Sequence, residues 1–460
     1  MQEDFKNNLP LTKFESMLKT NEVVFFDSSE FEGIIHYYFE QGRHSLAKKA
    51  INLGLSQHPS SINLKLLLAE LYIYEDDLDK ADRLLNQIYE IEPANEELYL
   101  NKATILSKRG KHEEAIASLH AALDFAHDSI DVLSMLGMEY LYLDNFSKAQ
   151  RYFAKCIEID GEDYSSLYNV IYCFDMENRH VDAIRFLNEF IDEKPFCEVA
   201  WHQLGRQYFI IEDYEKALEA FDYAVVIDDL FVGAYLEKAK TLERLKRYEE
   251  AIENYLVTTE LDDPTAFAYY RVGKSYHALG DEDQAVQYFK KTVIEDPLLD
   301  KGWMSLSDLY FNAEDYNKAL YYINKAIEID ETNNIFWRRF AEINLRLNLF
   351  EEVAQAFYKC LELGDENLEI YLGLVDVLNF IGEFDEALKY AVKANRNFPN
   401  HVEVEYRLSC LNFILGNNEK GVKHLKKALD KDAEHSLLFV DLYPTVFELQ
   451  QVQDMLAQYM

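Results

Sequence analysis

Residues 198–231 read EVAWHQLGRQYFIIEDYEKALEAFDYAVVIDDLF, and this stretch holds one full copy of the pattern that decides the fold. Its Ala217 recurs at steps of 34 residues from Ala47 to Ala387, with Val353 replacing it once and Gly421 lying one step further. No residue is inserted or lost between the copies. An unbroken period of this length is typical of a solenoid, in which each unit buries its apolar face against its neighbours. The sequence therefore predicts twelve stacked repeats.

Each repeat carries small, aromatic and turn-forming residues at fixed positions. The repeats, numbered internally from 1 to 34, begin at Ser28, Ile62, Glu96, Ile130, Tyr164, Glu198, Val232, Ala266, Asp300, Asn334, Leu368 and Val402. Positions 8 and 20 are mostly small and positions 11 and 24 are often aromatic, which predicts two closely packed helices per repeat. Position 15 is Gly, Asn or Asp in nine repeats, and these residues tolerate the left-handed conformation that ends a helix. Five of the eight prolines fall at position 32, where the second helix is expected to end.

This pattern resembles the tetratricopeptide repeat. The copy at 198–231 shows it best, through Trp201, Leu204, Gly205, Tyr208, Ala217, Phe221 and Ala224. The resemblance covers residues 28–435 and implies an all-α, right-handed superhelical solenoid of antiparallel helix pairs. It also implies a concave groove lined by the first helix of each repeat, through positions 2, 5, 6, 9, 12 and 13.

The two ends of the chain are expected to cap the array. Residues 1–27 hold a short amphipathic segment, 11–19, and an apolar run, 23–26; they are interpreted as an N-terminal cap, the alternative being a segment that lies in the groove. In residues 436–460, Pro444 is expected to end a short helix from Ser436 to Tyr443, and Thr445 to Tyr459 to form a final capping helix. Dimerisation through Phe439 and Phe447 is the alternative.

Composition limits the possible partners and the compartment. The 460 residues include 83 acids and 46 bases, for a net charge of −37, which argues against binding of nucleic acid or of anionic membranes. Residues 1–10 form no apolar signal core, and no run of about 18 apolar residues predicts membrane insertion. The five cysteines form no C-x-x-C motif and suit a reducing compartment, and Cys156 and Cys360 occupy position 27 as small core residues. We therefore expect a cytoplasmic protein.

The groove positions reverse sign along the chain. In repeats one to five they hold six acids and one base, but in repeats six to ten they hold nine bases and four acids. Arginine binds carboxylates through a planar fork, so the middle repeats are predicted to bind an extended acidic peptide or a free C-terminal carboxylate. The predicted binding residues are Tyr168, Asn169, Tyr172, Arg206, Lys240, Arg244, Tyr270, Arg271, Lys274, Lys301, Arg338 and Arg339. The alternative is that these bases pair with acids of a neighbouring repeat, for instance Arg271 with Glu237.

No motif for catalysis, a cofactor or a metal stands out. The sequence lacks H-E-x-x-H, G-x-x-x-x-G-K-[ST], G-x-G-x-x-G and G-x-S-x-G. His44, His112 and His180 recur at position 17 beside the turn and are interpreted as turn or packing residues. The lysine and asparagine set with which some family members hold a chaperone's C-terminus is matched in no three consecutive repeats. We expect no enzyme but an interaction scaffold for other proteins or peptides. The alternative is a structural or regulatory subunit that contacts partners through its acidic convex face and its ends.

Overall fold

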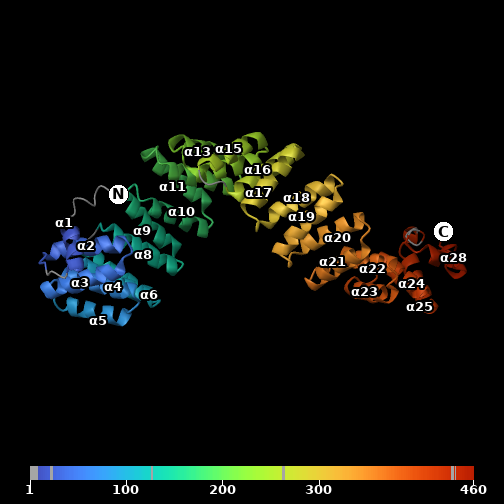
Figure 1. The fold of residues 1–460 in the computed structure, drawn as a ribbon, viewed down its shortest axis with the longest axis horizontal. Helices are drawn as coiled ribbons and strands as arrows, with labels where there is room; N and C mark the ends of the chain where they lie inside the picture. Colours follow the sequence, from blue (N-terminus) through green and yellow to red (C-terminus); the bar gives the residue numbers. More distant parts are fainter. Residues whose placement is uncertain are drawn as a thin grey trace. The chain divides into compact units, whose positions relative to one another are not determined.

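The computed structural model describes residues 9–20, 24–125, 128–261, 265–436, 440 and 442–459, and the regular elements within them are all helices (Figure 1). The chain divides into two compact units, an N-terminal unit of Met1–Asp228 and a C-terminal unit of Asp229–Met460. In each unit, helices that are consecutive in the chain pack against one another. This confirms the predicted all-α solenoid of helix pairs.

The N-terminal unit contains a leading helix and six helix pairs. The leading helix is α1, Leu9–Thr20. The pairs are α2 (Ser28–Glu40) and α3 (His44–Gln57), α4 (Ile62–Tyr74) and α5 (Leu78–Tyr89), α6 (Glu96–Lys108) and α7 (His112–Leu123), α8 (Ile130–Tyr142) and α9 (Phe146–Ile159), α10 (Tyr164–Met176) and α11 (His180–Glu193), and α12 (Glu198–Ile210) and α13 (Tyr214–Ile227).

The C-terminal unit contains six further pairs and a short closing segment. The pairs are α14 (Val232–Arg244) and α15 (Tyr248–Leu261), α16 (Ala266–Leu279) and α17 (Glu282–Glu295), α18 (Asp300–Asn312) and α19 (Tyr316–Ile329), α20 (Asn334–Arg346) and α21 (Phe350–Glu362), α22 (Leu368–Phe380) and α23 (Phe384–Asn397), and α24 (Val402–Ile414) and α25 (Asn418–Leu429). The closing segment holds the 3₁₀ turn η2 (Glu434–Ser436), α27 (Pro444–Phe447) and α28 (Gln450–Leu456). All twelve first helices begin at the residues predicted as repeat starts.

Position 15 ends the first helix in the left-handed conformation in every repeat. The φ angle is positive at the glycines, such as Gly42, and at the predicted Asp and Asn residues. It is also positive at Glu212 (63°), Lys246 (60°) and Glu314 (60°), where the side chain gives no such preference. The repeat geometry therefore imposes this conformation even on residues that disfavour it.

The small residue at position 8 makes room for the ring at position 24. A Cβ atom added to Gly205 would lie 2.6 Å from the ring of Phe221, and one added to Gly273 would lie 2.7 Å from Phe289. The aromatic residue at position 11 has a different neighbour, since it stacks on position 23, as Tyr310 does on Tyr322 with ring centroids 5.3 Å apart. The knob-and-hole packing is therefore as predicted for position 24, and position 11 adds a second aromatic layer.

The three tryptophans link successive repeats through a shared hydrogen bond. The indole N–H of Trp201 donates to the carbonyl of Pro195, and that of Trp303 donates to Pro297, each at 2.9 Å. Trp337 donates to Glu331 at 2.8 Å. In each case position 4 of one repeat reaches position 32 of the repeat before it, so a polar atom at the junction is satisfied.

Both ends pack on the array, but the C-terminal end differs from the expectation. Helix α1 buries Phe14 against Phe26 and against Tyr38 of the first repeat. Pro444 begins α27, where its missing N–H is no loss, and the described residues 440 and 442 just before it are helical. The single helix expected over 445–459 is broken at Glu448 and Leu449.

Other expectations at the ends and for the cysteines have mixed outcomes. The residues 1–8, 21–23, 437–439 and 441 lie outside the described part, and with them Phe439 and half of the helix expected over 436–443. Phe447 is half-buried against the core of the C-terminal unit. Cys156 and Cys360 are fully buried, which confirms them as core residues.

Candidate functional site on the first helices

The candidate site is the surface formed by positions 2, 5, 6, 9, 12 and 13 of the first helices, hereafter the first-helix face. Four predicted binding residues lie on this face in the N-terminal unit, and eight lie on it in the C-terminal unit. The two sets have different surroundings, so each is described within its own unit.

Arg271 on α16 forms an ion pair with the preceding repeat. Its guanidinium bonds to the carboxylate of Glu243 on α14, and its Nε donates to the Tyr255 hydroxyl at 3.2 Å. The Ser275 hydroxyl donates to the same carboxylate at 3.2 Å. The expected alternative partner, Glu237, pairs instead with Lys240 on its own helix at 2.8 Å. The pairing of Arg271 with Glu237 is therefore wrong in its partner, although a pair with the preceding repeat does form.

Arg338 and Arg339 on α20 are also neutralised. Arg339 lies 2.8 Å from Asp308 on α18 and 2.6 Å from Glu342, with its guanidinium over the ring of Phe311. Burial raises the pKa of Asp308, and the positive charge of Arg339 opposes that rise. Arg338 donates through Nε and Nη2 to both carboxylate oxygens of Asp365, at 2.5 and 2.6 Å, and these hydrogen bonds lower the pKa of Asp365.

The arginines at position 6 share one role. Arg271, Arg339 and Arg407 each pair with an acid on the first helix of the repeat before, the last with Asp376 through two bonds of 2.7 Å. An arginine that already pairs with a carboxylate has less net charge with which to attract a ligand. The main role of these arginines is therefore to connect successive repeats, and their role in binding a ligand is secondary.

Two lysines of the predicted set differ from the arginines. Lys274 on α16 and Lys301 on α18 are exposed, and within the described residues neither ammonium group has an ion pair or hydrogen bond. Burial lowers the pKa of Lys274, and the nearby charges of Arg271 and Lys301 lower it further. The one acid that lines the adjoining pocket, Glu243, is held by Arg271 and Ser275, so an incoming carboxylate could still be favoured beside the two lysines.

A pocket of about 320 Å³ adjoins Lys274. Arg244, Tyr248, Arg271 and Ser275 line it together with Lys274. Tyr248 was not predicted from the sequence, because it is the first residue of the second helix α15 and so lies outside the groove positions. Tyr270 is half-buried and its ring lies 5.8 Å from that of Phe289, so it packs in the core more than it faces a ligand.

In the N-terminal unit the predicted residues form a different surface. Tyr168 and Tyr172 are exposed on α10, Asn169 between them is half-buried, and Arg206 reaches Gln203 on its own helix at 3.3 Å. Met176 on α10 and Met138 and Tyr142 on α8 are exposed at positions 9 and 13 and extend the apolar surface. Their positions in the repeat were the available signal, but the charge pattern alone does not select them.

The three position-17 histidines contact the next repeat. His44 stacks on Tyr74 with centroids 3.6 Å apart, and His112 stacks on Tyr142 at 5.0 Å. His112 Nδ1 also lies 2.9 Å from the buried carboxylate of Glu139, and His180 Nδ1 lies 3.0 Å from Gln207. Their interpretation as packing residues is confirmed.

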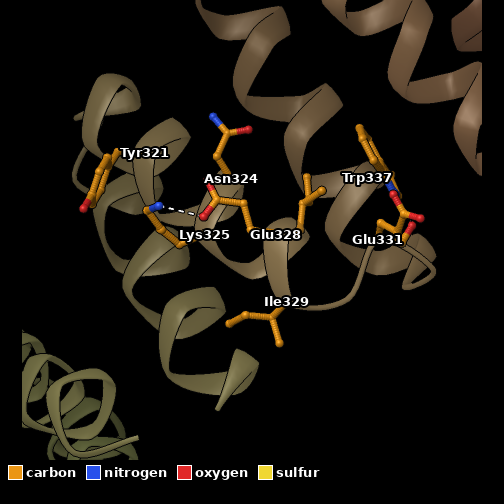
Figure 2. Close-up of a pocket in the computed structure, with 8 residues that line it drawn as sticks. Tyr321, Asn324, Lys325, Glu328, Ile329, Glu331 and Trp337 are labelled. Carbon is orange, nitrogen blue, oxygen red and sulfur yellow. Dashed lines mark hydrogen bonds and ion pairs between the residues drawn. The ribbon is translucent and has the colours of Figure 1, made fainter. Parts of the chain in front are cut away.

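A second pocket lies away from the first-helix face. It has a volume of about 590 Å³ and lies beside α19 and the turn that leads to α20 (Figure 2). Figure 2 shows Lys325 and Glu328 joined across one wall, at 2.6 Å, with Tyr321 and Trp337 on either side. The Trp337 N–H in this pocket already donates to the backbone carbonyl of Glu331.

None of the described helices is both long enough and apolar enough to cross a bilayer.

Comparison with known proteins agrees with the repeat pattern. Family models described as tetratricopeptide repeat match residues 72–138, 130–163, 202–264, 268–293 and 300–333. Anaphase-promoting complex subunit 3 of Schizosaccharomyces pombe is 23% identical over 159 residues. That match covers 35% of this chain but only 24% of the yeast protein, so the chain spans about a quarter of its relative's length.

Two solved structures are similar to the chain at low sequence identity. The crystal structure of the APC/C heterotetramer Cut9–Hcn1 is 14% identical, with a TM-score of 0.35, and the match covers 89% of this chain and 94% of that one. The crystal structure of YrrB, described as a TPR protein with an unusual peptide-binding site, is also 14% identical, with a TM-score of 0.34 and coverage of 40% and 95%.

Proposed function

We propose that this chain, which is a tetratricopeptide repeat protein, is a non-catalytic scaffold that holds an acidic or carboxylate-terminated segment of a partner protein. The proposed site is the first-helix face of the C-terminal unit around Lys274 and Lys301. A cytoplasmic location and the division into caps at 1–27 and 436–460 around repeats at 28–435 are part of the same proposal.

One observation carries the proposal: Lys274 and Lys301 are exposed cations without a partner among the described residues, and Lys274 lines a pocket together with Arg244, Arg271 and the Glu243 carboxylate that Arg271 holds. The paired arginines Arg338 and Arg339 are secondary, since a ligand would have to displace or share Asp365, Asp308 and Glu342.

Charge alone does not give useful affinity. An exposed ion pair contributes about 0.2–1 kcal/mol, whereas a micromolar complex needs about −8 kcal/mol. The remainder has to come from apolar contacts. Tyr248 in the pocket wall and the exposed ring of Phe267 on α16 are the nearest candidates. We therefore expect a ligand with an aromatic or aliphatic residue next to its carboxylates.

The test uses fluorescent peptides and the full chain. The probe is a ten-residue peptide with four glutamates, one phenylalanine and a free C-terminus, and its comparators carry glutamines or an amidated end. The double variant Lys274→Glu, Lys301→Glu is expected to weaken binding at least tenfold, because two attractive charges become repulsive. Lys423→Glu on α25, an exposed lysine of the same unit, is the matched control and should change binding less than twofold.

The two peptide comparators separate the two forms of the proposal. Loss of binding with glutamines assigns the site to acidic side chains, and loss with the amidated end assigns it to a terminal carboxylate. Equal binding by the double variant and the unmodified protein would reject the site.

A second candidate function has its own supporting observation. Large apolar side chains are exposed on second helices and on the turns after them, including Phe196 (82%), Val226 (80%), Ile294 (76%) and Leu298 (76%). Exposed apolar groups away from the first-helix face suit a structural or regulatory subunit that contacts partners through its outer surface. A partner whose capture is lost in Phe196→Ser, and unaffected by the lysine reversals, would favour this alternative.

A further inference from the structure

An apolar stripe crosses the first-helix face of the N-terminal unit. Tyr168, Tyr172 and Met176 follow one another at intervals of four along α10, so they share one side of that helix. Met138 and Tyr142 occupy the corresponding side of α8. The exposed fractions of these five side chains lie between 36% and 58%. They form the apolar stripe of the N-terminal unit.

The stripe is not a by-product of core packing. The core of these repeats is filled by other positions, such as Leu136, Val170 and Phe174, which are almost fully buried. Aromatic and methionine side chains that remain exposed together are typical of binding surfaces, because they give large contact area at low entropic cost. The ring of Tyr142 rests on His112, which fixes its direction.

The charges on this face are mostly negative, and the bases on it are Lys108 on α6, which pairs with Asp76, and Arg206 on α12. Asp131 on α8 is exposed and, within the described residues, pairs with no base. Further along the same unit, Glu32, Glu70 and Glu97 lie on α2, α4 and α6, and none of them has an ion pair with a lysine or arginine in the described part of the chain. Burial, and after it the charges of Glu70 and Glu32, raise the pKa of Glu97 to about 7.

We infer that the first-helix face of the N-terminal unit is a second binding surface, for a partner segment that carries lysines or arginines together with large apolar side chains. Charge complementarity selects this occupant, because an acidic segment would add to uncompensated repulsion. The cationic part would lie towards α2, α4 and α6, and the apolar part on α8 and α10. This surface is separate from the proposed site at Lys274 and Lys301 and carries the opposite charge.

The test needs a probe and variants of the full chain. The probe is a fluorescent twelve-residue peptide with four arginines, one leucine and two phenylalanines, and comparators replace the phenylalanines by serine or the arginines by glutamate. Binding is measured by anisotropy at 0.15 M salt, where the Debye length of about 8 Å suppresses nonspecific attraction to the acidic surface. We expect at least tenfold weaker binding by Tyr168→Ser, Tyr172→Ser, and similarly weaker binding by Glu70→Lys, Glu97→Lys.

Two controls keep the result specific. Phe196→Ser removes an exposed ring from the turn after α11 and should leave binding of the probe within twofold. The Lys274→Glu, Lys301→Glu variant should also bind the basic probe normally, which separates this inference from the proposed function. Circular dichroism checks that each variant is folded.

Three outcomes would overturn the inference. The first is equal binding by the aromatic and charge variants and the unmodified protein. The second is equal binding of the serine comparator, since a general attraction to a chain of charge −37 would explain it. The third is self-association that Tyr168→Ser, Tyr172→Ser abolishes in sedimentation, since a second copy of the chain would then cover the stripe.

Discussion

Both units are built from the same kind of helix pair, but their first-helix faces carry charges of opposite sign. In the C-terminal unit, Arg271, Arg339 and Arg407 are held by acids of the preceding repeat. In the N-terminal unit, Glu70 and Glu97 pair with no base among the described residues, and an apolar stripe is exposed beside them. On the first-helix face, these arginines thus link successive repeats of the C-terminal unit, whereas Glu70 and Glu97 have no such link in the described part of the N-terminal unit. Where charged residues of neighbouring repeats pair with one another, a count of charges along the groove therefore overestimates the charge that is available to bind a ligand.

The largest effect is expected from breaking a link between repeats. Arg407 is only 4% exposed, and it donates to Asp376 twice at 2.7 Å and to Glu403 at 3.2 Å. Arg407→Ala leaves these acids without their partner and should cost about 3–5 kcal/mol. Urea unfolding, with hydrogen exchange of α22 and α24 as the local readout, measures the loss.

Arg206→Ala is the control for that prediction in the other unit. Arg206 is exposed and bonds only within its own helix among the contacts described, so its loss should cost less than about 0.5 kcal/mol. Similar losses for the two variants would contradict the distinction between linking and available charges.

The next effect tests whether the cores of the two units are equivalent. Gly205→Ala in the N-terminal unit and Gly273→Ala in the C-terminal unit both force a Cβ atom against a buried ring. Each should cost about 1–3 kcal/mol, because a close-packed core cannot absorb an added methyl group. Phe221→Leu should restore part of the stability in the Gly205→Ala background, measured by thermal unfolding. A large loss in one unit alone would show that the frameworks differ.

A smaller effect depends on pH. The pKa of Glu97 is raised from its usual 4.5 to about 7, so the folded state binds the extra proton. The stabilising effect of that proton is complete below about pH 4.5 and is lost as pH rises through about 7. Glu97→Gln should therefore be neutral near pH 4 and should gain stability, at most about 1 kcal/mol after solvent screening, by pH 8. Equal gains at both values in urea titrations would argue against repulsion in this unit.

The smallest effect is expected at the turns. Glu212 and Lys246 adopt positive φ angles that glycine adopts without a steric penalty. Glu212→Gly and Lys246→Gly should each stabilise their repeat by about 0.5 kcal/mol in thermal unfolding, one in each unit. Gly280→Ala is the reverse control and should destabilise.

The sequence predicted the framework because the framework is local and repeated. Helix starts, the left-handed turn at position 15 and the Gly205–Phe221 contact each depend on two or three positions at a fixed spacing. Twelve copies of that spacing leave little freedom, so every first helix begins where expected. The break in the last helix at Leu449 falls outside the repeat, where no such copies exist.

The site was less predictable because it depends on side-chain reach. A guanidinium can reach acids at several positions on the first helix of the preceding repeat. Arg271 pairs with Glu243, and Glu237 pairs with Lys240 on its own helix. Arg338 reaches Asp365 in the turn before the next repeat, beyond any groove position. Face assignments from repeat positions therefore located the candidate residues but not their partners.

The three tryptophans make the intrinsic fluorescence of the protein a reporter of unfolding at defined junctions. Each tryptophan crosses one junction, at Pro195, Pro297 or Glu331, and these three are all the tryptophans in the chain. Tryptophan emission from the unlabelled protein would therefore report unfolding at these three junctions. Unfolding of the first four repeats would not change it. Apparent midpoints from fluorescence and from circular dichroism should consequently diverge whenever unfolding begins at the N-terminal end.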